Sequence, residues 1–223
     1  MATPSHIQAV KSLNKSPSHL MILTSSWSYI MMYLQKYLIH NPSEVLKVTS
    51  KLRYYPKEYV RKFMAEAMSF VLRNAPDQQL ERGIKKVIKE AVKKPYRESC
   101  VELLLYNIMK GCSSRLHSKA ERVLQLLTSE TIFHIGGGAD QESRTTILAI
   151  IKSVFKRLCE TMEPKELNLV WSCLYKKVHE CVNTGNIMHL RRILSVLVSG
   201  VKVQKGQKVS GLEPLISWRV QFS

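Results

Sequence analysis

"YYPKEYVRKFMAEAMSFVLRNA", residues 54–75, sets a pattern that most of the chain follows. A proline precedes about four turns in which small and aromatic apolar residues recur at helical spacing. Proline costs no hydrogen bond at the first turn of a helix. Phe63, Ala67 and Phe70 recur at i, i+4 and i+7, so this spacing predicts a helix with that face buried between its neighbours.

The same helical spacing continues through the rest of the chain, without a convincing period-two strand. Prolines precede or open several of the segments, and glycines suit their ends. The pattern predicts nine helices, at about 24–39, 43–52, 57–74, 77–94, 97–110, 117–128, 142–161, 165–182 and 187–202.

Consecutive helices joined by such short turns must pack as antiparallel pairs. Pairs that continue to stack form a solenoid, in which each unit buries its apolar face against the next. We therefore expect an all-α fold, a HEAT/ARM-like α-solenoid over 24–203, with a globular helical bundle as the alternative. Residues 1–23 are expected to form a flexible N-terminus, and 204–223 a C-terminal tail or a truncated next repeat.

Residues 129–141, "SETIFHIGGGADQ", interrupt the helical pattern. Three glycines before a helix suggest a phosphate loop, but the segment lacks a G-K-[ST] or G-x-G-x-x-G motif and no strand precedes it. A flexible linker between helices is the better interpretation.

The charge balance is strongly basic, with 34 Lys plus Arg against 17 Asp plus Glu and a formal charge of +17. Both halves contribute, since residues 1–110 hold 18 basic and 8 acidic side chains and the remainder holds 16 and 9. Such a charge favours a polyanionic partner, either a nucleic acid or an acidic protein surface.

The expected helix after Pro76 concentrates this charge on one side. Leu80, Ile84, Val87, Ile88 and Ala91 share one face of it, which we expect to be buried. A stripe of five basic residues that could follow a phosphate backbone lies opposite: Arg82, Lys85, Lys86, Lys89 and Lys93. The alternative is a solvated face that only keeps the helix soluble.

Further basic groups that could extend the surface are Lys94, Arg97, Lys176-Lys177 and Arg191-Arg192. No aromatic RNA-reading motif accompanies them, so contacts should be to shape and phosphate.

Local catalytic, metal and membrane signals are weak. The seven histidines are scattered, and no H-E-x-x-H or G-x-S-x-G motif is present, which predicts a non-enzymatic protein without cofactor or small-molecule substrate. Cys173, His179 and Cys181 are spaced onto different helix faces, so we expect no metal site there. The uncharged run at 20–35 is too short and polar to span a bilayer, and no membrane association is expected.

The opening stretch resembles a HEAT-repeat helix, in which a Val-Arg pair is followed by small residues. Val60, Arg61, Ala65 and Ala67 match that pattern, with Met64 where alanine is usual. The resemblance implies that the valine packs inward, that the arginine ties one repeat to the next, and that the small residues allow helices to approach. Phe63 and Phe70 are then expected to fill the core face with Val71.

A longer stretch, residues 28–75, resembles the N-terminal region of the DRIM (down-regulated in metastasis) family. The matching residues are Tyr33, Leu34, Lys36, Tyr37, Leu38, Val60, Arg61, Phe63, Ala65, Glu66, Phe70 and Arg73. The match continues more loosely through "RESCVELLLYNIMKGCSSRLHSKAERVLQLL". Members of that family are many times longer, so we expect this chain to be a fragment or a truncated form.

This resemblance implies a nucleolar HEAT-repeat scaffold of the small-subunit processome, a snoRNP-associated assembly on precursor rRNA. Other processome proteins and pre-rRNA or snoRNA are then the expected partners, and no catalytic residues carry over. A protein-only HEAT-repeat adaptor for acidic partner proteins is the alternative, since carboxylates and phosphates are bound by the same lysines. An enzyme with a site assembled from distant residues is the third hypothesis.

Overall fold

The structure of the chain is a computed structural model that describes residues 46–47, 50, 53–54, 56–93, 100–135 and 141–206. Seven α-helices and one 3-10 helix follow one another through this part of the chain. They are α5 (Glu58–Asn74), α6 (Asp77–Lys93), α7 (Val101–Met109), α8 (Ala120–Leu127), η3 (Glu130–His134), α9 (Gln141–Thr161), α10 (Pro164–Asn183) and α11 (Ile187–Gly206).

Among the described residues, β-structure is limited to one isolated antiparallel bridge between Lys110 and Leu116. It closes the turn that joins α7 to α8, where Ser113 has a positive φ of 56°. The all-α prediction is therefore confirmed.

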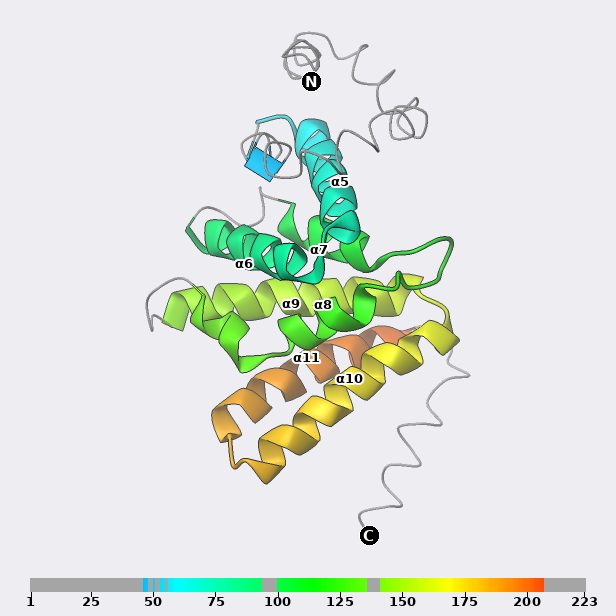
Figure 1. Cartoon of the computed structure of the whole chain (residues 1–223). Coiled ribbons are helices and arrows are strands. Elements are labelled where there is room, and N and C mark those ends of the chain that lie inside the picture. The colour runs from blue at the N-terminus through cyan, green and yellow to red at the C-terminus, as the bar shows by residue number, and fades with distance from the viewer. Residues whose placement is uncertain are drawn as a thin grey trace, which may run out of the picture.

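Alternate helices stack on one another. Helix α5 packs against α7, α7 against α9, and α9 against α11, so four helices follow one another down the molecule (Figure 1). Helices α6, α8 and α10 belong to a second layer, in which α8 packs against α10. Each helix thus contacts mainly its neighbours along the stack, which is the arrangement of a helical-repeat solenoid.

Short turns make this stacking possible. Ala75 and Pro76 join α5 to α6, and Met162 and Glu163 join α9 to α10. Helices α10 and α11 form an antiparallel hairpin (Figure 1), whose turn contains Gly185 at a φ of +65°. A side chain other than glycine would be strained in this left-handed conformation.

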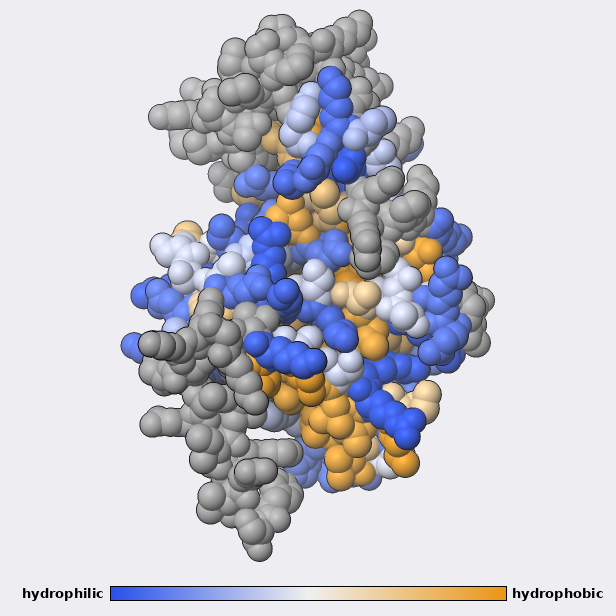
Figure 2. All heavy atoms as spheres, turned by 180° about the vertical axis from the view of Figure 1, so that it is seen from behind, coloured by the Kyte–Doolittle hydropathy of each residue, from blue (hydrophilic) through white to orange (hydrophobic). Residues whose placement is uncertain are grey.

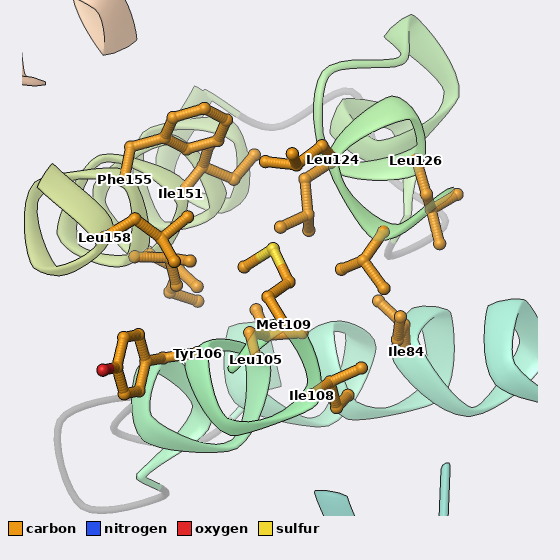
Figure 3. Close-up of a cluster of buried hydrophobic side chains, with 14 of the residues drawn as sticks. Ile84, Leu105, Tyr106, Ile108, Met109, Leu124, Leu126, Ile151, Phe155 and Leu158 are labelled. Carbon is orange, nitrogen blue, oxygen red and sulfur yellow. The ribbon is translucent and has the colours of Figure 1, made fainter. Parts of the chain in front are cut away.

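The core is continuous through the stack, and its centre lies where α6, α7, α8 and α9 meet. Met109 of α7 extends from its helix toward Leu124 of α8 and the side chains of α9 (Figure 3). Met109, Leu124 and Ile84 of α6 are fully buried, and Phe155 of α9 is 1% exposed. These apolar side chains hold four consecutive helices in place, including the helix that carries the basic stripe.

The expected helix bounds agree closely with the structure for α5, α6, α9 and α10. Helix α7 begins only at Val101, because Cys100 has a left-handed conformation with a φ of 50°. Helix α8 begins at Ala120, three residues later than expected, after a turn in which the Ala120 N–H bonds to the carbonyl of His117. Helix α11 extends to Gly206. The expected helix at 24–39, most of 43–52, and residues 1–23 and 207–223 lie outside the described residues.

The expected flexible linker at 129–141 needs correction over its first half. Residues Glu130–His134 form η3, and Ile132 and Phe133 are 0% and 1% exposed. Burying these two apolar side chains against the core stabilises the segment. The glycines at 136–138 lie outside the described residues.

Candidate nucleic-acid interface

Helix α6 divides into an apolar and a basic side, as its sequence predicts. Leu80, Ile84, Val87, Ile88 and Ala91 are all fully buried. An acidic residue in the first turn of the helix and a basic residue in the last also suit its macrodipole. The apolar side fixes the orientation of α6, so the opposite side must face outward.

Gly83 allows α6 to approach α5 closely. An alanine Cβ at this position would lie 2.3 Å from Cδ2 of Leu72, which is itself fully buried. The missing Cβ thus leaves room for the Leu72 side chain between the two helices, although glycine lowers the intrinsic helix propensity.

The basic stripe occupies the outward side of α6. Arg82, Lys86, Lys89 and Lys93 are exposed, and Lys85 is half-buried. From the first to the last of them the helix rises about 17 Å. Five positive charges therefore follow one line on a helix that is held by the core.

All three acidic side chains of α6 are engaged away from this stripe. Asp77 and Glu81 pair with Lys119 and Arg122 around the start of α8, and Glu90 pairs with Arg53. None of the five stripe residues makes an ion pair with another described residue. No described acidic side chain therefore pairs with the positive charges of the stripe.

The pairs with α8 form a small network at the start of α6. The Lys119 ammonium donates a hydrogen bond to the Asp77 carboxylate and holds the pKa of Asp77 below its usual value. Arg122 lies 2.7 Å from Glu81 through Nη2 and 3.7 Å from Asp77 through Nε. These contacts join α6 to α8 and neutralise two of the three negative charges of α6.

The third negative charge compensates a buried arginine. Arg53 is fully buried, and its Nη2 donates to Glu90 Oε2 over 2.8 Å. The Ser50 hydroxyl donates to the same oxygen, also over 2.8 Å. Glu90 therefore binds to the segment that precedes α5, and it does not neutralise the neighbouring Lys86 and Lys89.

The other basic groups that could extend the stripe do not gather beside it. Lys176 and Lys177 belong to α10, and Lys177 Nζ lies 2.5 Å from Glu180 Oε2. Arg191 and Arg192 belong to α11, further along the stack from α6 (Figure 1). Lys94 and Arg97 fall outside the described residues.

The residues expected to pack the repeats lie on α5. Val60, Phe63 and Ala67 are 1%, 6% and 6% exposed, whereas Phe70 is half-buried. The side of α5 that joins the continuous core is formed instead by Ala65, Met68 and Leu72. The aromatic spacing thus identified a buried side of the helix, but not the side that contributes to the continuous core.

Two arginines of α5 anchor the helix at its ends. Arg61 donates to the carbonyl of Pro56 through Nη1 and also lies near the thiol of Cys100, just before α7. Arg73 Nη1 donates to the carbonyl of Lys110 at the end of α7, over 2.8 Å. Nothing in the sequence pattern points to this role of Arg73 except its place as a basic residue in the last turn of α5.

The described residues hold no group of three or more His, Cys, Asp and Glu side chains that could bind a metal ion. Cys173 and Cys181 are buried, whereas His179 is exposed. Burial also raises the pKa of the Cys159 thiol to about 12, so this sulfur stays protonated near neutral pH. Within the same residues no helix has both the length and the apolar character needed to cross a bilayer.

No established protein-family model matches the sequence. The chain is similar to the U3 small nucleolar RNA-associated protein 20 of Saccharomyces cerevisiae, with 22% identity over 189 residues. The similar region covers 82% of this chain but only 7% of the yeast protein, which is therefore many times longer.

Proposed function

We propose that this chain is a non-catalytic scaffold segment of a nucleolar small-subunit processome component, supporting pre-rRNA processing and assembly of the small ribosomal subunit. In this role the α6 stripe contacts the phosphates of pre-rRNA or snoRNA, and other surfaces of the solenoid contact processome proteins.

The observation that carries the proposal is the uncompensated stripe. Lys85, Lys86 and Lys89 lie on a helix whose acidic side chains are all paired elsewhere, so their charges are available to an external anion. A rigid line of ammonium and guanidinium groups suits a sugar-phosphate backbone, because each contact releases counterions. Contacts of this kind position an RNA without reading its bases.

The similarity to a yeast protein named for its association with U3 small nucleolar RNA supports the choice of RNA over an acidic protein. It extends along most of this chain. A solenoid built from successive repeats also offers a long surface on which several partners can assemble.

Crosslinking of the tagged protein to RNA in cells tests the proposal. We expect precursor rRNA or U3 small nucleolar RNA to be recovered with the wild-type chain, and much less with the triple variant Lys85→Gln, Lys86→Gln and Lys89→Gln. A matched control replaces the exposed Lys156, Lys165 and Lys176 with glutamine. It removes the same charge from α9 and α10, and recovery should stay near the wild-type level.

Three other outcomes would contradict the proposal. Recovery of unrelated RNA alone would argue against a role in the processome. Equal losses in both triple variants would mean that net charge, and not the stripe, attracts RNA. Recovery of no RNA, together with co-purified acidic proteins, would favour the protein-only adaptor.

A further inference from the structure

Helix α11 is apolar on two sides, only one of which is covered. Ile193 and Val196 are each 1% exposed and pack against the core with α9 and α10. On the other side Leu194 is 41% and Val198 49% exposed. A helix that is apolar around most of its circumference is normally buried on both sides. The second side of α11 therefore has the composition of an interface.

The exposed side continues toward the start of the helix. Ile187 and Met188 are 63% and 59% exposed, and Ile187, Leu194 and Val198 follow one another at i, i+7 and i+11. Figure 2 shows an apolar area over the lower half of the molecule, where α10 and α11 lie, with hydrophilic side chains along its borders.

This surface is hollowed where α9 and α11 run side by side. Two open hollows lie there, and we refer to them together as the α9–α11 groove. Its apolar lining consists of Leu148, Met188, Leu194 and Val198. Its charged lining is entirely basic and consists of Arg144, Lys152, Arg191, Arg192 and Lys202.

Glu130 interacts electrostatically with Arg192, but these basic side chains have no close acidic partner within the described part of the chain. None of the five makes an ion pair there. The guanidinium of Arg192 lies 5.0 Å from the centre of the Phe133 ring. The Nε atom of Arg144 is buried and has no hydrogen-bond partner among the described residues. A buried N–H without a partner beside an apolar groove favours an acceptor supplied by a ligand.

We propose that the α9–α11 groove binds an amphipathic helix of a partner protein, with an apolar stripe bordered by Asp and Glu. The apolar stripe would cover Leu194 and Val198, and the carboxylates would pair with the basic side chains along the groove.

Other occupants fit the groove less well. A phosphate backbone would leave the apolar centre of the groove against polar atoms. A second copy of the same surface would bring like charges together.

A designed peptide of about five turns serves as the probe. It carries leucines at helical i, i+4 and i+7 spacing with glutamates on both sides. We expect it to bind the full chain in a fluorescence anisotropy titration. Two comparison peptides have lysine in place of glutamate, or the same composition in scrambled order, and both should bind at least about tenfold more weakly.

Matched surface variants locate the binding. Leu194→Asp should weaken binding of the glutamate peptide by about tenfold or more. Val182→Asp should change it little, because Val182 is 59% exposed on α10 and lines neither hollow. Arg191→Glu should weaken binding more than Lys176→Glu does. The triple glutamine variant of Lys85, Lys86 and Lys89 should bind the peptide as the wild type does, which keeps this test separate from that of the α6 stripe.

Several results would overturn the proposal. These are no binding of the glutamate peptide, equal binding of the lysine peptide, or equal losses in Leu194→Asp and Val182→Asp. Binding of a uridine oligonucleotide or of phosphatidylserine vesicles that is lost in Leu194→Asp would assign the groove to RNA or to a membrane surface instead.

Discussion

At the scale of single residues, His189 shows how one buried polar side chain makes stability depend on pH. It is 3% exposed, and its Nε2 lies 3.0 Å from the carbonyl oxygen of Thr128. A carbonyl can only accept, so Nε2 carries the proton, and Nδ1 is left without a partner among the described residues. Burial lowers the pKa of His189, although the Thr128 carbonyl and Glu130 oppose this effect.

The sign of the resulting pH dependence follows from this lowered pKa. Below its ordinary value of 6.5 the histidine binds a proton in the unfolded chain before it does so in the folded one. Stability should therefore be full above about pH 6.5 and fall as the pH decreases below it. His189→Gln keeps an N–H for Thr128 but does not titrate. The wild type should lose more melting temperature between pH 7.5 and 5.5 than this variant, and equal losses would contradict the account.

Substitutions at Phe63 and its neighbours test which side of α5 is buried. The ring is 6% exposed, so Phe63→Ala should lower the free energy of unfolding by about 3–5 kcal/mol. Lys62→Ala should change it little, because Lys62 and its partner Glu58 are both exposed. Phe70→Ala should lie between the two, since Phe70 is half-buried. Chemical denaturation of the three variants measures the order, and a cost for Phe70→Ala as large as that for Phe63→Ala would contradict it.

At the scale of elements, α6 combines two kinds of ion pair that should differ in strength. Glu90, itself 28% exposed, compensates the fully buried Arg53, whereas the partner of Glu81, Arg122, is 47% exposed. Removing one partner of a buried pair leaves an uncompensated charge, so Glu90→Ala should cost about 3 kcal/mol. Glu81→Ala should cost less than about 1 kcal/mol. Urea denaturation of the two variants separates them, and equal costs would show that Arg53 finds compensation elsewhere.

The sequence predicts the elements well but not their partners. The apolar spacing of α6 identified all five of its buried side chains, because 3.6-residue periodicity depends only on local geometry. That Asp77 and Glu81 pair with Lys119 and Arg122 depends on contacts between residues about 40 positions apart, which the periodicity of one helix does not contain. The burial of Ile132 and Phe133 is not predicted for a different reason. The adjacent glycines favour a flexible linker, although these two side chains belong to the core.

At the scale of the whole molecule, the stack of α5, α7, α9 and α11 implies that stability is local. In a solenoid each repeat is stabilised mainly by its neighbours. Ile193 of α11 is 1% exposed, and Ile193→Ala should loosen the end of the stack to which it belongs. Amide hydrogen exchange should become faster in α9, α10 and α11, and change little in α5 and α6. Uniform acceleration along the chain would instead indicate a single cooperative bundle.

The central claim is that the α6 stripe binds RNA through phosphates, and the salt dependence of affinity tests it most directly. Dissociation constants for a structured RNA, measured over a range of salt concentrations, report from their slope how many phosphates the protein neutralises. The variant with Lys85, Lys86 and Lys89 replaced by glutamine should fold normally, bind more weakly, and show a slope smaller by about one for each phosphate that it no longer neutralises. The control variant at Lys156, Lys165 and Lys176 should keep the wild-type slope. An unchanged affinity and slope in the stripe variant would contradict the claim and make the stripe a solvated face.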